Sequence, residues 1–139
     1  MAITLNNKVG LKINSIDLSD HVTSVTLNQA FDELEVTAMG DTAHKFVKGL
    51  ESATLTVSFL NDQAAGEVLD TLSDAFGTTT GWKLIQDSGS AVSATNKLWT
   101  GDILVNNLTP INGAVGDMAT MDITFTVNSA VTVADSGTF

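Results

Sequence analysis

The chain of 139 residues contains no cysteine, no arginine and no tyrosine, and it has a single proline. Without cysteine it can form no disulfide framework, no thiol nucleophile and no cysteine-ligated metal site. Six lysines face sixteen acidic residues, and the resulting formal charge of −10 argues against a nucleic-acid reader or a protein that docks on anionic lipid. No apolar run is long enough for a membrane span, and the first residues lack the layout of a secretion signal. We therefore expect one acidic domain over residues 1–139, made in a cytoplasm, with no membrane partner.

Alternation of apolar and polar residues is the main pattern along the chain. Residues 52–59 and 120–127 alternate without an error, which is typical of strands with one buried and one wetted face. A phase slip near Ser15 predicts a bulge or two short strands within residues 9–18. Shorter alternating stretches predict further strands at 22–28, 31–37, 98–105 and 131–133 and around Trp82, with a tight connection at 28–30.

One segment has helical rather than strand periodicity. Apolar residues recur at helical spacing over residues 62–76, with Asn61 as the expected N-cap and Gly77 placed to end the helix. Its apolar stripe needs a sheet to pack on. The chain is therefore predicted to be mainly β, a β-sandwich or partly closed barrel with one flanking α-helix.

A long connection at residues 38–50 does not fit a core assignment. Thirteen residues are long for a hairpin loop, and long loops in compact domains are usually functional or disordered. This one is too apolar for plain disorder and carries His44, Lys45 and Lys48. Two interpretations stay open at this point: the loop folds back as a small satellite cluster, or it docks into a neighbouring copy of the acidic chain.

The sequence offers no clear catalytic or metal-binding pattern. His21 and His44 lie in different segments without a recognisable ligand spacing, so each is expected to be an exposed loop histidine. The acidic cluster Asp32, Glu33 and Glu35 lacks the features of a calcium loop and is interpreted as a solvated strand edge. No nucleophile motif and no phosphate cradle is present. We expect no enzymatic activity, no cofactor and no metal.

The order of segments resembles the tail tube (major tail) proteins of long-tailed bacteriophages over about residues 8–133. The resemblance is carried by two early strands leading into Val36–Leu50 (VTAMGDTAHKFVKGL), a long alternating strand, one helix, and Asn112–Thr120 (NGAVGDMAT) before the last long strand. Contractile tails and type VI secretion tubes share this architecture, so the type of tail stays open.

The resemblance implies a structural virion protein whose hexameric rings stack into a tube that conducts DNA into the host. It implies copies of itself as the main partner, with tape measure, tail terminator and baseplate or tip proteins as further partners and DNA passing without specific contacts. The protein would reside in the virion tail, after assembly in the host cytoplasm. The loop between the early strands would contact the adjacent ring, and its candidate contact residues are Met39, Asp41, His44, Lys45, Phe46, Val47 and Lys48.

A ring of six such chains would carry a formal charge of 6 × −10 = −60. Acidic groups facing the bore would repel phosphate, so that DNA slides rather than sticks. Asp102 and Asp122, on the polar phase of long strands, are the candidate lumen-facing acids. The alternative is that both face outward and that threonine and serine line the bore. The competing function is a monomeric β-sandwich binding module, such as an adhesin or a capsid decoration domain.

Overall fold

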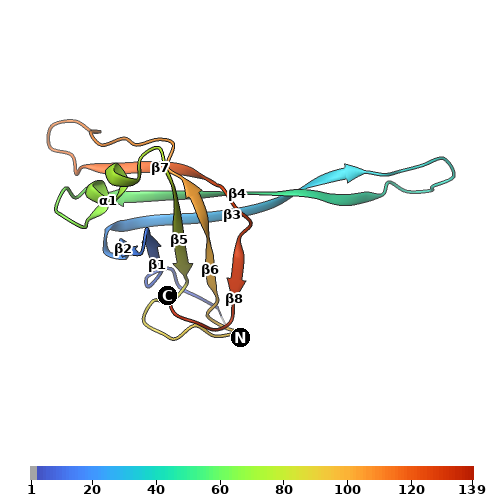
Figure 1. The fold of residues 1–139 in the computed structure, drawn as a ribbon, viewed down its shortest axis with the longest axis horizontal. Helices are drawn as coiled ribbons and strands as arrows, with labels where there is room; N and C mark the ends of the chain where they lie inside the picture. The colour runs from blue at the N-terminus through green and yellow to red at the C-terminus, as the bar shows by residue number, and fades with distance from the viewer. Residues whose placement is uncertain (1–2) are drawn as a thin grey trace.

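The structure, a computed structural model, describes residues 3–139. Within this range the chain forms one antiparallel sheet of eight strands with a single α-helix and a short 3-10 helix, which confirms the predicted mainly β class (Figure 1). The strand order is β2-β1-β5-β6-β7-β4-β3, with β8 added to β6, and the sheet is not closed into a barrel. The elements are β1 (Gly10–Ile13), β2 (Ile16–Asp17), η1 (Ser19–His21), β3 (Val22–Glu35), β4 (Phe46–Leu60), α1 (Val68–Ala75), β5 (Thr79–Ile85), β6 (Leu98–Leu104), β7 (Thr120–Val127) and β8 (Thr132–Ala134).

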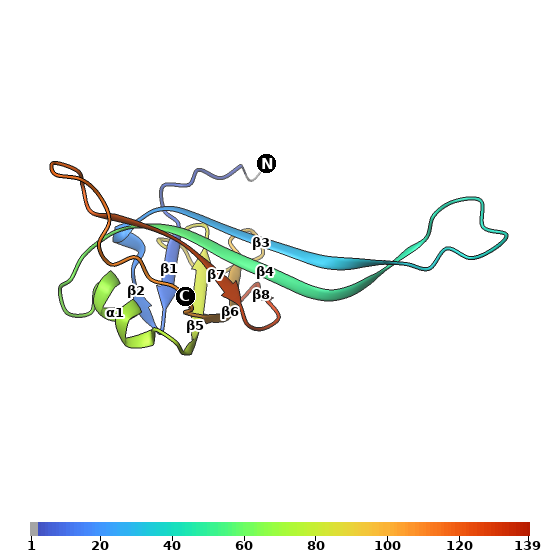
Figure 2. The ribbon, with the colours of Figure 1, turned by 90° about the horizontal axis from the view of Figure 1, so that it is seen from above.

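The sheet folds over on itself between β6 and β7. These strands pair only at Ile103↔Val127 and Leu104↔Thr126, whereas β7 pairs with β4 from Thr120 to Thr126. Beyond this short junction, β3, β4 and β7 form one layer that crosses a second layer of β1, β5, β6 and β8 (Figures 1 and 2). Such crossed layers bury side chains between their inner faces.

One apolar cluster fills the space between the two layers. It contains Leu55 and Phe125 from the first layer and Leu11 and Ile103 from the second, all fully buried. Because these layers share one core, their outer faces point away from each other. This separation decides which surface residues can lie on the same side of the molecule.

Helix α1 closes one edge of the core, since Val68, Leu69, Leu72 and Ala75 join the central cluster. The predicted helix is confirmed but begins later than expected. Gly66 has a φ of +78°, and the first helical residue follows Glu67, not Asn61. Residues 62–67 form turns in which the Asp62 carboxylate accepts a hydrogen bond from the Ala64 N–H. No helix in the described range is long and apolar enough to cross a bilayer.

Strands β3 and β4 differ from the sequence prediction. The connection expected at 28–30 does not exist, because Asn28, Gln29 and Ala30 pair with Thr54, Ala53 and Ser52 inside one continuous strand. The long loop expected at 38–50 is shorter, since residues 46–50 belong to β4 and only 36–45 connect the strands. The phase slip near Ser15 corresponds to two short strands joined at Asn14 and Ser15, both at positive φ as in a two-residue hairpin turn.

Candidate functional site

A hairpin projects from the body of the molecule and ends far from the core (Figures 1 and 2). We define this arm as residues 31–51, which comprise the distal parts of β3 and β4 and the tip at 36–45. Strand β7 pairs with β4 only from Thr54 onward, so in the arm the two strands pair only with each other. A two-stranded ribbon of this kind is marginally stable in water without further packing.

The arm carries a concentration of apolar surface. None of its residues belongs to the central cluster, so the loop does not fold back as a satellite of the core. Exposed apolar side chains gathered on one projecting element are candidates for an interaction surface. Its exposed large apolar side chains are Phe31, Leu34, Val36, Met39, Phe46, Val47 and Leu50.

The tip of the arm is ordered by its own hydrogen bonds. The Asp41 carboxylate accepts a bond from the Ala38 N–H at 2.8 Å and pairs with the Lys45 ammonium at 2.8 Å. Lys45 first, and then the Ala38 N–H, hold the pKa of Asp41 below its usual range. The Asp41 N–H donates in turn to the Ala38 carbonyl at 3.1 Å, and Gly40 has a φ of +92°. This is the geometry of a type II turn, and it leaves Met39 fully exposed.

A register shift between Phe31 and Glu33 marks a bulge at the base of the arm. The Lys48 ammonium lies 4.6 Å from the centre of the Phe31 ring. A Cβ atom at Gly49 would lie 2.9 Å from the Asp32 Cβ, so the close approach of the two strands requires glycine there. Bulges increase the local twist of a ribbon, which sets the direction in which the arm leaves the body.

The structure brings all seven predicted contact residues into the distal arm. Met39, Asp41, His44 and Lys45 lie in the tip, while Phe46, Val47 and Lys48 begin β4. The basic character is weaker than predicted, because Lys45 is paired with Asp41 and Lys48 lies opposite Glu33. Sequence reasoning missed Phe31 and Leu34, although their exposed positions directly precede the connection.

Asp102 and Asp122 do not lie on one surface. Asp122 lies on the outer face of the β3–β4–β7 layer, next to Ser58, whereas Asp102 lies on β6 in the other layer, beside the buried Ile103. Because the outer faces of the two layers point apart, one flat wall cannot include both carboxylates.

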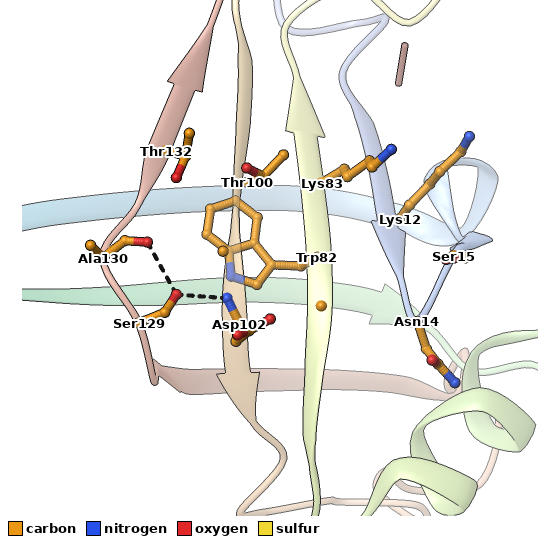
Figure 3. A pocket seen from close by; sticks show the side chains of 12 residues that line it. Lys12, Asn14, Ser15, Trp82, Lys83, Thr100, Asp102, Ser129, Ala130 and Thr132 are labelled. Atoms are coloured by element: carbon orange, nitrogen blue, oxygen red, sulfur yellow. Dashed lines mark hydrogen bonds between the residues drawn. The ribbon is translucent and has the colours of Figure 1, made fainter. Parts of the chain in front are cut away.

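Asp102 borders an open depression of about 560 Å³ on the second layer (Figure 3). Lys12 of β1 and Lys83 of β5 lie directly opposite each other there, and the ammonium groups donate to the carbonyls of Phe139 and Thr138. The Ser129 hydroxyl accepts a hydrogen bond from the Asp102 N–H at 2.9 Å. The C-terminal carbonyls thus satisfy a lysine pair that would otherwise be repulsive.

A second cluster surrounds His21, which was expected to be an exposed loop residue but has a side chain only 17% exposed. Its Nδ1 faces Asp20 at 2.8 Å and Glu67 at 3.3 Å, and its Nε2 faces Asp62 at 3.0 Å. Partial burial acts to lower the pKa of His21, but these hydrogen bonds and carboxylate charges outweigh it and raise the pKa. Asp20, His21 and Glu67 bring three possible metal-ligand atoms within 4.8 Å, although a protonated imidazole satisfies the carboxylates by itself.

Comparison with known proteins gives a match in fold. No family model matches the sequence, and no curated protein matches it. Among solved structures, the chain is similar to a chain from the virion of a native gene transfer agent particle, with a TM-score of 0.76 and 11% sequence identity. The match covers 95% of this chain and 99% of that chain. At this identity the comparison shows that the two chains share one fold over nearly their whole length.

Proposed function

We propose that this chain is a structural virion protein that polymerises as stacked hexameric rings into a tail tube, a conduit for DNA. The observation that carries the proposal is the arm: a coreless hairpin that projects from a well-packed body and exposes seven large apolar side chains. Exposing this much apolar surface is unfavourable for an isolated subunit and is relieved when another subunit covers it.

The shared fold supports a virion role. The similar chain belongs to a virion, and the two chains cover almost all of each other. The segment order that resembles tail tube proteins points in the same direction. The arm also occupies the place in the chain that the resemblance assigns to contact between rings.

The outer face of the β3–β4–β7 layer is suited to line a bore. The outward-facing residues of this layer alternate with the buried core residues. Most of them carry a hydroxyl or an amide group, and Asp122 is the one that is charged. We name it the hydroxyl face: Ser24, Thr26, Asn28, Thr54, Thr56, Ser58, Asp122, Thr124 and Thr126. In a ring of six, Asp122 would place six carboxylates on this wall, and the absence of lysine there leaves no fixed cation to hold phosphate.

The width of such a bore follows from strand geometry. Three strands from each of six copies make about 18 strands, which at ~4.8 Å spacing and ~40° tilt give a circumference of roughly 110 Å. The backbone diameter is then roughly 36 Å, and about 5 Å of side chain on each side leaves a bore of roughly 26 Å. A DNA duplex fits in such a bore without tight contact.

Removal of the arm tests the proposal. Ala30 and Ser52 are directly opposite in register, so replacing residues 31–51 by Asn-Gly joins them through a two-residue hairpin turn. Concentrated wild-type protein is expected to form tubes in electron micrographs and to scatter light strongly. The trimmed variant is expected to keep the far-ultraviolet circular dichroism of the body and to form no tubes.

Val133 supplies a matched control, because it is a partly exposed apolar residue on β8 outside the arm. Val133→Ser is expected to form tubes like the wild type, whereas Phe46→Ser shortens them or prevents them. A wild-type protein that stays a strict monomer at high concentration would contradict the proposal and favour the monomeric binding module.

A further inference from the structure

Residues 135–139 follow β8 and end beside β1 and β5 (Figure 1). We name this segment the strap. All of its residues before Phe139 are exposed, Gly137 has a φ of +108°, and only Phe139 is partly covered. The strap is therefore an exposed connection that leads to one anchored aromatic residue.

The strand register shows which face of the second layer the strap covers. Gly10 pairs with Ile85, and Ile85 pairs with Leu98, so these residues form one row across β1, β5 and β6. Residues that are directly opposite on antiparallel strands share a face of the sheet. The neighbouring residues Leu11 and Leu84 belong to the central cluster, and successive side chains of a strand point to opposite faces. The row therefore lies on the outer face.

This outer row contains apolar groups that are buried apart from the central core. Ile85 is 0% exposed and Leu98 is 5% exposed, although neither belongs to the central cluster. The Phe139 ring lies at the β1 end of the row, because a Cβ atom at Gly10 would come within 2.7 Å of that ring. The missing side chain of Gly10 thus leaves the space that the ring occupies. The row and the ring form a second, smaller apolar site.

Two lysines of the next row on the same face hold the backbone of the strap. Lys12 and Lys83 are directly opposite each other, and both side chains lie on this face (Figure 3). The Lys12 ammonium donates to the Phe139 carbonyl at 2.9 Å and lies 4.6 Å from the centre of the Phe139 ring. The Lys83 ammonium donates to the Thr138 carbonyl at 3.1 Å. The site therefore contacts one aromatic ring and two backbone carbonyls.

We infer that the outer face of the second layer carries a peptide-docking site and that the strap is its built-in ligand, which releases and rebinds while the body stays folded. The ligand is a short peptide segment with an aromatic residue, whose carbonyls accept hydrogen bonds from the lysine pair. Release breaks only these few contacts, so it requires less free energy than unfolding of the central core. A closed strap keeps the apolar row covered. The inference does not depend on the proposed function, because the strap and its site belong to the same chain.

The chain has no cysteine, so one introduced thiol can report on the strap. Ile85→Cys, the strap reporter, places a thiol in the outer row, and Ile103→Cys, the core reporter, places one in the central cluster. Both isoleucines are 0% exposed, so the two substitutions are matched. The rate at which a thiol reagent modifies each protein measures how often its site opens. Thermal melting checks that both variants fold.

The strap reporter is expected to react about tenfold faster than the core reporter, because local opening requires less free energy than unfolding. Its rate is also expected to depend less on urea, since release of the strap exposes less surface than unfolding. Both rates are measured at a concentration that prevents assembly. Equal rates with equal urea dependence would show that the strap belongs to the cooperative body and would overturn the inference.

Variants of the anchor test which contacts close the site. Phe139→Ala and Lys12→Met, each added to the strap reporter, are expected to raise its rate further and to leave the core reporter unchanged. Lys48→Met is the matched control, because the Lys48 ammonium lies at the same 4.6 Å from the Phe31 ring in the arm. This control is expected to leave both rates unchanged. If Phe139→Ala does not raise the rate of the strap reporter, the ring does not close the site and the inference is wrong.

A free peptide shows whether the site recognises the strap itself. Phe139→Ala in the strap reporter removes the anchor, and the peptide of residues 134–139 (ADSGTF) is then added at millimolar concentration, comparable with the effective concentration that a short tether provides. The peptide is expected to slow modification, whereas the same peptide with Phe139→Ala is not. Protection by neither peptide, or by both equally, would exclude a site that recognises this segment. All of these outcomes leave the proposed function untouched, because they are measured on unassembled protein.

Discussion

Strands β3 and β4 run through two environments, the body and the arm, and the difference between them shows what the arm needs. In the body, β4 places Leu55, Val57 and Phe59 in the core with no exposure. In the arm, the same strand places Phe46, Val47 and Leu50 in water. Backbone pairing continues across both regions, but side-chain burial stops at about Ala53.

The body is therefore stabilised by its buried side chains. The arm is held only because its two strands continue from paired strands of the body. Hydrogen bonds of a two-stranded ribbon contribute little net free energy, since water competes for both partners. The arm gains stability mainly when something covers it. A region that is ordered but unburied is suited to form a contact whose strength depends on the partner.

The largest expected difference between the two regions concerns removal of an aromatic ring. Phe125→Ala in the body is expected to lower the free energy of unfolding by about 3–5 kcal/mol, because it leaves a cavity in the core. Phe46→Ala in the arm is expected to change it by about 0.5 kcal/mol or less, because this ring is already exposed. Urea denaturation of both variants at a concentration that prevents assembly gives the two values. Equal losses would show that the arm shares the cooperative core.

The body was the part of the fold that the sequence predicted well. Burial of one strand face imposes a period of two, and residues 52–59 and 120–127 show it without error. The same reasoning failed where burial stops. Residues 46–50 do not pack on the core, so their sequence lacks the apolar–polar alternation that would have predicted a strand. Asn28 and Gln29 suggested a turn because they are polar, but they lie in an edge strand where both positions are exposed.

The candidate site was predicted only in part, for physical reasons that differ between residues. The tip residues were recognisable from loop length and apolar content. The turn at 38–41, in which the Asp41 N–H donates to the Ala38 carbonyl, could not be recognised before its hydrogen bonds were seen. His21 and Asp62 are 41 positions apart, and only the folded chain brings them together.

A smaller effect is expected for the polar cluster that joins two segments of the body. His21→Gln removes the imidazolium that Asp20, Asp62 and Glu67 surround, and below about pH 6 it is expected to cost about 1–2 kcal/mol. His44→Gln is the matched control, because His44 is 78% exposed in the arm, and it is expected to cost much less. Urea denaturation over a pH series measures both.

The sign of the pH dependence follows from the direction of the shift. The pKa of His21 is raised above 6.5 in the folded protein, so its contribution is fully present below about pH 6.5. The contribution is lost as the pH rises through the folded pKa. The difference in unfolding free energy between wild type and His21→Gln must therefore shrink as the solution becomes alkaline. A difference that grows with pH would show that the neutral ring is the stabilising form.

The smallest effect is expected at the tip of the arm and should be local. Asp41 holds the turn by accepting from the Ala38 N–H and pairing with Lys45, and these contacts lower the pKa of its carboxyl. A lowered pKa means that the stabilisation is present above the unfolded value of 3.8 and is lost as the pH falls through the folded value. The amide signal of Ala38 in nuclear magnetic resonance spectra should therefore shift with that titration, while the core amides do not.

Asp41→Ala should remove the transition, leave the unfolding midpoint of the body unchanged and weaken assembly, since Met39 then loses its fixed direction. If the core amide signals shifted together with that of Ala38, the arm and the body would form one cooperative unit. The arm would then not differ from the body in what stabilises it.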